Sequence, residues 1–130
     1  MGMVTFVDET TAGERHAGGG LDVAEGRLAL REVIRRRVFQ EVAECNSRTT
    51  GVFRGLVRPT DAERTLNGYE LRTPRRIDPE RQFRQAVEAF GRNGFLVLVG
   101  EWQIEDLDAE VDLSPGTEVT FLKLVPLAGG

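Results

Sequence analysis

The last third of the chain, residues 94–130, constrains the fold more than any other stretch. Apolar runs at 95–99 and 118–125 predict two strands, and the residues at 114–117 predict a turn before the second one. The second run has apolar residues on both of its faces: Val119, Phe121 and Val125 on one, Leu122 and Leu124 on the other. Since a strand with one solvated face would alternate apolar and polar residues, both faces of this strand need cover.

The residues after the second run form a tail that consists of Pro126, Leu127, Ala128, Gly129 and Gly130. Glycine has no Cβ, so paired glycines allow a backbone carboxylate to enter a channel that excludes side chains. At full extension the tail would reach roughly 17 Å. An α-carboxyl group is ionised at neutral pH and can attack the α-phosphate of ATP as a nucleophile. The tail therefore predicts an activated carboxylate on Gly130, with the four residues before it lying in the channel of an activating enzyme.

Short motifs in the same stretch resemble the ubiquitin-like β-grasp family. The GTEV run at 116–119 is similar to the sulfur carriers of thiamine and molybdopterin synthesis, whereas LVG at 98–100 and IED at 104–106 are similar to ubiquitin. The resemblance covers roughly residues 3–45 and 94–130. It implies one α+β domain over residues 1–130, in which a mixed sheet packs on one helix, with an insertion at about 46–93 and a flexible tail at 126–130.

The N-terminal residues predict a β-hairpin followed by a helix. Residues 3–7 and 21–23 have strand character, and the polar, glycine-containing residues between them predict a long connection. The glycines at 18–20 are followed by a strand rather than a helix, so they do not fit a phosphate-binding loop. A helix is predicted at about 29–44 because apolar residues recur there every three or four positions. Its apolar face consists of Leu30, Val33, Ile34, Val38, Val42 and Cys45.

Two features of the predicted helix leave alternatives open. Arg35, Arg36 and Arg37 point in different directions, so we interpret them as a solvated face, and the alternative is a surface for an acidic partner. Cys45 ends the apolar face, which favours a buried small hydrophobe over a catalytic thiol. No histidine lies close to Cys45 in sequence to activate its sulfur.

The insertion at about 46–93 is itself patterned. Residues 51–57 and 69–72 have strand character and suggest a second hairpin. Asp78 and Pro79 then mark the start of a second helix, as N-cap and first helical residue. The apolar face of this helix is predicted to consist of Phe83, Ala86, Val87 and Phe90, and Gly91 or Gly94 is predicted to end it.

A surface for a protein partner is predicted on the sheet. The first helix would cover one face, and the insertion is expected to cover part of the other. The uncovered part is predicted to expose Val97, Leu122 and Leu124. Val97 aligns approximately with an isoleucine on the partner-binding face of ubiquitin, so this assignment is implied by the resemblance.

Composition argues against several classes of protein. The net charge is −4, whereas a general nucleic-acid binder is normally basic. No run of residues is apolar enough to suggest a membrane span, and a single cysteine is compatible with the cytoplasm. Carboxylates are plentiful, but no metal-ligand or catalytic motif accompanies them. We therefore expect no metal and no bound cofactor, and a substrate of enzymes rather than an enzyme.

The function that these features predict is a ubiquitin-like protein modifier. An ATP-dependent activating enzyme would adenylate Gly130, and the partners implied are this enzyme, a conjugating enzyme, a JAB-type peptidase and protein targets. One alternative is a sulfur carrier with a C-terminal thiocarboxylate, and another is a β-grasp interaction module that is never conjugated. An arginine-rich nucleic-acid adaptor is disfavoured because no aromatic and basic residues interleave as they do on a stacking platform.

Overall fold

The computed structural model describes residues 2–47, 52–53, 55–57, 62–65, 68–71 and 77–124. Within these ranges the chain is an α+β protein with two helices and a mixed five-stranded sheet. It divides into two compact units, the first made of residues 1–33 and 90–130 and the second of residues 34–89. The sheet belongs to the first unit, and most of the predicted insertion belongs to the second.

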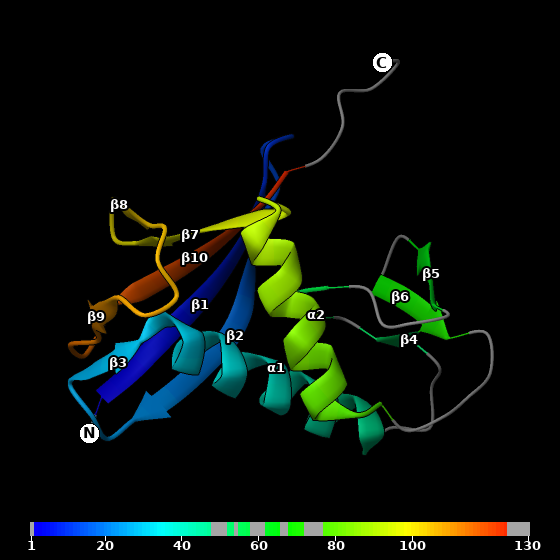
Figure 1. The fold of residues 1–130 in the computed structure, drawn as a ribbon, viewed down its shortest axis with the longest axis horizontal. Coiled ribbons are helices and arrows are strands. Elements are labelled where there is room, and N and C mark those ends of the chain that lie inside the picture. The colour runs from blue at the N-terminus through cyan, green and yellow to red at the C-terminus, as the bar shows by residue number, and fades with distance from the viewer. Residues whose placement is uncertain are drawn as a thin grey trace. The chain divides into compact units, whose positions relative to one another are not determined.

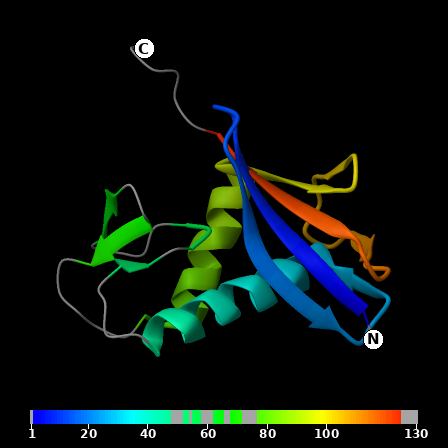
Figure 2. The ribbon, with the colours of Figure 1, turned by 180° about the vertical axis from the view of Figure 1, so that it is seen from behind.

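The first unit is built on a sheet whose strands come from both ends of the chain (Figure 1). The strands of this unit are β1 (Gly2–Thr10), β2 (Arg15–Val23), β3 (Arg27–Ala29), β7 (Phe95–Val99), β8 (Trp102–Ile104), β9 (Glu110–Asp112) and β10 (Glu118–Lys123). The sheet order is β2-β1-β10-β7-β8, with β3 and β9 paired separately. Strands β1 and β10 are parallel and the other pairs are antiparallel. Seen from behind, β2, β1 and β10 run side by side (Figure 2).

One side of this sheet, the core face, carries Val4, Phe6, Val97, Val119 and Phe121. All of these side chains are at most 1% exposed, because apolar residues occupy alternate positions on each strand and so point to the same side. Three phenylalanine rings meet there: Phe121 lies 5.6 Å from Phe6 and 6.2 Å from Phe95, between ring centroids. These aromatic contacts hold the first strand, the last strand and β7 together.

The hairpin of β1 and β2 is confirmed, but the long connection predicted within it is wrong. The backbone turns tightly, since Thr10 N donates to Glu14 O at 2.9 Å. The Thr10 hydroxyl oxygen also accepts hydrogen bonds from the backbone N–H groups of Ala12 and Glu14, each at 3.3 Å. The glycines at 18–20 lie inside β2, where Gly20 pairs with Thr5. Glycine composition suggested a loop, whereas pairing with β1 imposes a strand.

The C-terminal half of the sheet follows the prediction closely at its strands. Strand β7 has the predicted bounds, and the predicted turn lies directly before β10, with Gly116 at φ +86°. Strand β10 ends at Lys123, earlier than predicted, and Val125 lies outside the described residues. The short strands β8 and β9 fall in a polar stretch for which no strand was predicted.

Helix α1 (Leu30–Asn46) starts in the first unit, where two backbone bonds fix its first turn. Leu30 N donates to Ala109 O and Arg31 N donates to Leu107 O, each at 2.9 Å. These bonds satisfy N–H groups that a helix start otherwise leaves without partners. The predicted apolar face of the helix is confirmed, and each of its members is at most 7% exposed: Leu30, Val33, Ile34, Val38, Val42 and Cys45.

Helix α2 (Pro79–Gly91) starts as predicted, because the Asp78 carboxylate caps it by accepting from Glu80 N at 3.0 Å. On its predicted apolar face Ala86 is fully buried and the phenylalanines are half-buried. The helix ends at Gly91, one of the two glycines predicted to end it, and the left-handed conformation that follows is adopted by Asn93, whose φ is +60°.

The second unit also contains a three-stranded sheet with the order β4-β6-β5. Its strands are β4 (Val52–Phe53), β5 (Ala62–Thr65) and β6 (Gly68–Leu71). Strands β4 and β6 pair antiparallel, as the predicted second hairpin requires. Strand β5 was not predicted, because its sequence AERT lacks an apolar run.

Candidate functional site

The outer face of the five-stranded sheet, opposite the core face, is the candidate site. It consists of Val7, Leu96, Leu98, Thr120 and Leu122, which occupy the alternate positions of β1, β7 and β10. Val7 and Leu98 both pair with Thr120, so the three side chains form one row across the sheet. Leu96 and Leu122 form the next row. The leucines are half-buried, which leaves part of an apolar surface open to contact.

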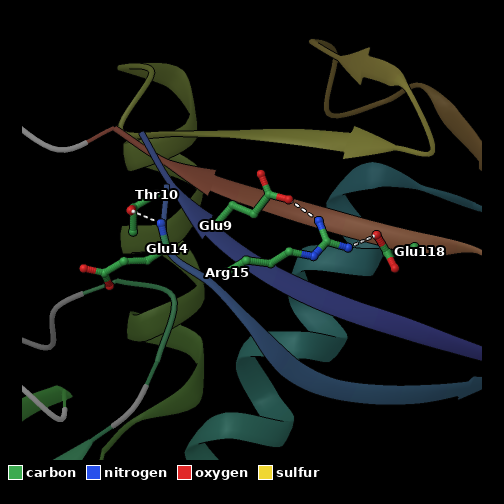
Figure 3. A network of polar contacts seen from close by, with 5 residues as sticks. All are labelled: Glu9, Thr10, Glu14, Arg15 and Glu118. Carbon is green, nitrogen blue, oxygen red and sulfur yellow. Dashed lines mark hydrogen bonds and ion pairs between the residues drawn. The ribbon is translucent and has the colours of Figure 1, made fainter. Parts of the chain in front are cut away.

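An ion-pair bridge crosses this face. Arg15 on the edge strand β2 donates to Glu9 on β1, and its second nitrogen lies 2.5 Å from the Glu118 carboxylate on β10. In Figure 3 the guanidinium lies between the two carboxylates and above the strands. Hydrogen bonding to Glu118 and the negative charges of both partners raise the pKa of Arg15. The bridge therefore ties three strands together with a permanently charged group.

Val97, predicted to be exposed for a partner, is instead fully buried on the core face. The prediction was wrong by one position, and a one-residue shift moves a side chain to the opposite face of a strand. Leu96 and Leu98 hold the half-buried outer positions on either side of it. Of the other predicted contacts, Leu122 is half-buried on the outer face and Leu124 is 44% exposed just after β10.

The tail, which is predicted to carry the chemistry, comes after β10 in the sequence. Pro126, Leu127, Ala128, Gly129 and Gly130 lie outside the described residues, so their predicted role stays a prediction. The chain before them is held to the hairpin turn, since Thr11 N donates to Lys123 O at 3.1 Å. The outer face therefore includes the strand that leads directly to the tail, β10.

Arg35 and Arg37 depart from the solvated face that the sequence predicted for the three consecutive arginines of α1. Arg37 is only 3% exposed and donates to Glu41, whose other oxygen accepts from Leu56 N at 2.8 Å. Arg35 binds Glu80 through both terminal nitrogens, and its guanidinium carbon lies 4.4 Å from the centre of the Phe39 ring. The hydrogen bonds from Arg35 lower the pKa of Glu80. Arg35 and Arg37 thus have structural partners inside the second unit.

A hollow of about 570 Å³ lies in the second unit beside the end of α1. Its lining is mostly apolar and consists of Phe39, Val42, Ala43, Asn46, Ser47, Ile77 and Pro79. The Asn46 amide binds both backbone groups of Ile77, accepting from N at 2.8 Å and donating to O at 3.0 Å. Because its amide is engaged in this way, Asn46 holds the chain at the start of α2 rather than presenting a reactive group to the hollow.

Other groups with potential chemistry are few in the part of the chain that the structure describes. Cys45 is buried, as predicted for a packing residue, and His16 is exposed. No cluster of histidine, cysteine and carboxylate side chains among the described residues could hold a metal ion. Neither described helix combines the length and the hydrophobicity that crossing a bilayer requires.

Comparison with known proteins adds no assignment: the chain matches no protein-family model, and neither a curated protein nor a solved structure matches it significantly. Any functional proposal therefore depends on the sheet, its outer face and the sequence of the tail. Sequence reasoning missed the bridge of Arg15. The period of two along a strand could have indicated that Glu9 lies on the same face as Val7.

Proposed function

We propose that the chain is a ubiquitin-like protein modifier, whose Gly130 carboxylate is activated by an ATP-dependent enzyme and then joined to amines of target proteins. The observation that carries the proposal is the parallel pairing of β1 with β10, which runs from Thr5 opposite Glu118 to Thr10 opposite Lys123. This pairing lays the N-terminal hairpin beside the last strand in a mixed sheet, an arrangement compatible with a β-grasp fold. The strand that leads to the tail is therefore interior to the sheet and firmly held.

The proposed chemistry takes place at the end of the chain. The Gly130 carboxylate attacks the α-phosphate of ATP in the activating enzyme, forming an acyl-adenylate and releasing pyrophosphate. A cysteine thiolate of the enzyme then displaces AMP to form a thioester, and a target amine displaces that thiolate to form an amide. In this scheme the chain is a substrate of enzymes and binds no cofactor or metal of its own. ATP belongs to the activating enzyme.

The proposed docking surface is the outer face, together with Leu124 at the base of the tail. Leu96, Leu98 and Leu122 are half-buried there, so a partner can remove further apolar area from water at about 25 cal/mol per Å². The bridge of Arg15, Glu9 and Glu118 adds charged groups to this face. Charges on an interface contribute to partner choice more than to affinity, which suits a surface that must select one cognate enzyme.

A sulfur carrier is the alternative function, and the turn before β10 favours it. In the GTEV run that resembles the sulfur carriers, Gly116 adopts φ +86°, a backbone conformation that residues with a Cβ rarely adopt. The turn therefore requires a glycine at position 116. In a carrier, sulfide would displace AMP from the acyl-adenylate and leave a thiocarboxylate on Gly130.

One experiment separates these functions. The protein is incubated with its cognate activating enzyme, ATP and sulfide, and then with a lysate from the same cell, and intact mass and conjugates are measured. Isopeptide-linked targets support the modifier, whereas exchange of one oxygen for sulfur without conjugates supports the carrier. The matched control lacks Gly129 and Gly130 and should give neither product. If the intact chain gives no adenylate, and the shortened chain retains every partner, the protein is an interaction module that is never conjugated.

A further inference from the structure

Trp102 extends the buried face of the sheet out into solvent. By strand pairing, Phe6 lies opposite Val119, Val119 opposite Val99, and Val99 opposite Trp102. Phe6 and Val119 are at most 1% exposed and Val99 is half-buried, whereas Trp102 is 77% exposed. The apolar row therefore continues to the edge strand β8 and ends there on an uncovered indole.

Leaving this indole in water forgoes a large stabilisation. A tryptophan side chain buries as much as about 250 Å² when it packs, and tryptophan is enriched at the centres of protein interfaces. Strand β8 pairs with β7 alone among the strands that the structure describes, so one side of β8 has no strand partner in these ranges. Strand β8 therefore offers a partner both an aromatic anchor and a free strand edge.

The charges around Trp102 indicate what kind of partner fits. From Gly100 to Asp112, both included, the sequence contains six carboxylates and no basic residue. Asp108 is paired with Arg31 at 3.3 Å, and Asp112 accepts hydrogen bonds from Ser114. Glu101 and Glu105, which flank β8, are exposed and form no ion pair with any residue that the structure describes. The surroundings of the indole therefore attract a cation.

We propose that Trp102, Glu101 and Glu105 form a docking surface for a basic segment of a partner protein. An arginine or lysine of that segment stacks on the indole face, and the two carboxylates at the ends of β8 attract the positive charge of the segment. The π-electrons of an indole face attract a cation, and desolvation strengthens this attraction. The phosphate backbone of a nucleic acid is repelled by the same carboxylates. The indole is on the core-face side of the edge strand, so it is separate from the leucines of the outer face, and its binding does not depend on activation of Gly130.

Trp102 is also the probe for the test, because it is the only tryptophan in the chain. The full chain is titrated with a short capped peptide of alternating arginine and serine, and tryptophan fluorescence is recorded. A peptide of alternating glutamate and serine serves as the charge-reversed probe. We expect a saturable change in fluorescence with the arginine peptide alone, and a dissociation constant that rises with salt.

Variants then test the surface by calorimetry with the same arginine peptide. We expect Trp102→Ala to weaken binding about fivefold or more, and Glu101→Gln with Glu105→Gln to weaken it by a similar factor. The matched control is Asp22→Asn with Glu88→Gln, which makes the same change in net charge at exposed positions on other elements, and should alter binding less than about twofold. Circular dichroism checks that each variant is folded.

Three outcomes would overturn the proposal. The control variant could weaken binding as much as the Glu101 and Glu105 variant, which would indicate general charge attraction. The glutamate peptide could bind as well as the arginine peptide. Sedimentation could show the free chain associating with itself through Trp102, so that Trp102→Ala makes it monomeric; the indole would then pack against a second copy.

Discussion

The ring of Phe6 meets the ring of Phe121 edge to face, with centroids 5.6 Å apart and planes at 81°. Phe6 comes from the first strand and Phe121 from the last, so this contact closes the first unit across almost the whole length of the sequence. Both rings are at most 1% exposed. The aromatic pair and the parallel strand pairing therefore both join β1 to β10, the strand that leads to the tail.

Phe121→Ala is expected to lower the free energy of unfolding by about 3–5 kcal/mol, because it removes a buried ring and leaves a cavity between Phe6 and Phe95. Urea unfolding followed by circular dichroism measures the change. Trp102→Ala is the matched control, since it also removes a large aromatic side chain but at a position that is 77% exposed. Its effect should stay within about 0.5 kcal/mol. Similar losses in both variants would contradict the assignment of the core.

The elements that could be predicted from sequence were those with a clear hydrophobic period. The apolar face of α1, the bounds of β7 and the start of α2 at Asp78 all depend on local signals, namely helical spacing, a continuous apolar run and a capping carboxylate. The burial of Cys45 followed from its place at the end of the α1 stripe. Local patterns of this kind survive folding because tertiary contacts reinforce them.

The predictions that were wrong or absent concern features that depend on tertiary contacts. The glycines of β2 and the polar residues of β8 have weak strand propensity, and they form strands because a neighbouring strand supplies hydrogen bonds. The face of Val97 depended on register, which a short apolar run cannot specify when both neighbours are leucine. Arg37 was assigned to solvent because arginine is usually exposed, but Glu41 on the next turn compensates its charge.

Arg37 and Glu41 are expected to behave as a coupled pair in the second unit. Their side chains are 4% and 12% exposed, so Arg37→Met would remove a cation that contacts the Glu41 carboxylate and cost about 3 kcal/mol in unfolding free energy. Adding Glu41→Gln removes the carboxylate charge while keeping an acceptor for Leu56 N. The double variant should therefore be more stable than Arg37→Met alone by roughly 1 kcal/mol or more. Additive losses in a double-mutant cycle measured by urea unfolding would show that the pair is not coupled.

Gly116 is expected to be needed because it can adopt a positive φ, and not because a larger side chain would clash with neighbouring atoms. A methyl group at Gly116 would meet no atom within 4 Å outside the adjacent residues, yet the φ of +86° is unfavourable for alanine. Gly116→Ala should therefore destabilise the chain by about 1 kcal/mol. Gly26→Ala is the control, because the space there is equally open and the backbone is not in the left-handed region. It should be neutral or stabilising by up to about 1 kcal/mol. Equal effects of the two substitutions on the urea midpoint would refute this distinction.

Leu98 and Val97 are neighbours that point to opposite faces of β7, so substituting each one tests whether the outer face docks the activating enzyme. Leu98→Gln changes the half-buried outer position, whereas Val97→Ala changes the fully buried one. We expect Leu98→Gln to reduce kcat/KM for ATP–pyrophosphate exchange by about tenfold, because a partner loses apolar contact area there. Val97→Ala should instead lower the free energy of unfolding by about 2 kcal/mol, with exchange near normal while the chain is folded.

Glu88→Gln, on the exposed side of α2, is the control for this comparison and should leave both measurements unchanged. The two substituted positions are adjacent in sequence but lie on opposite faces of β7, so one substitution tests partner contact and the other tests core packing. If Leu98→Gln is activated as fast as the unaltered chain, while deletion of Gly129 and Gly130 still abolishes exchange, the tail is recognised without the outer face. The leucines of β7 would then have a packing role alone, and partner choice would reside in residues 124–130.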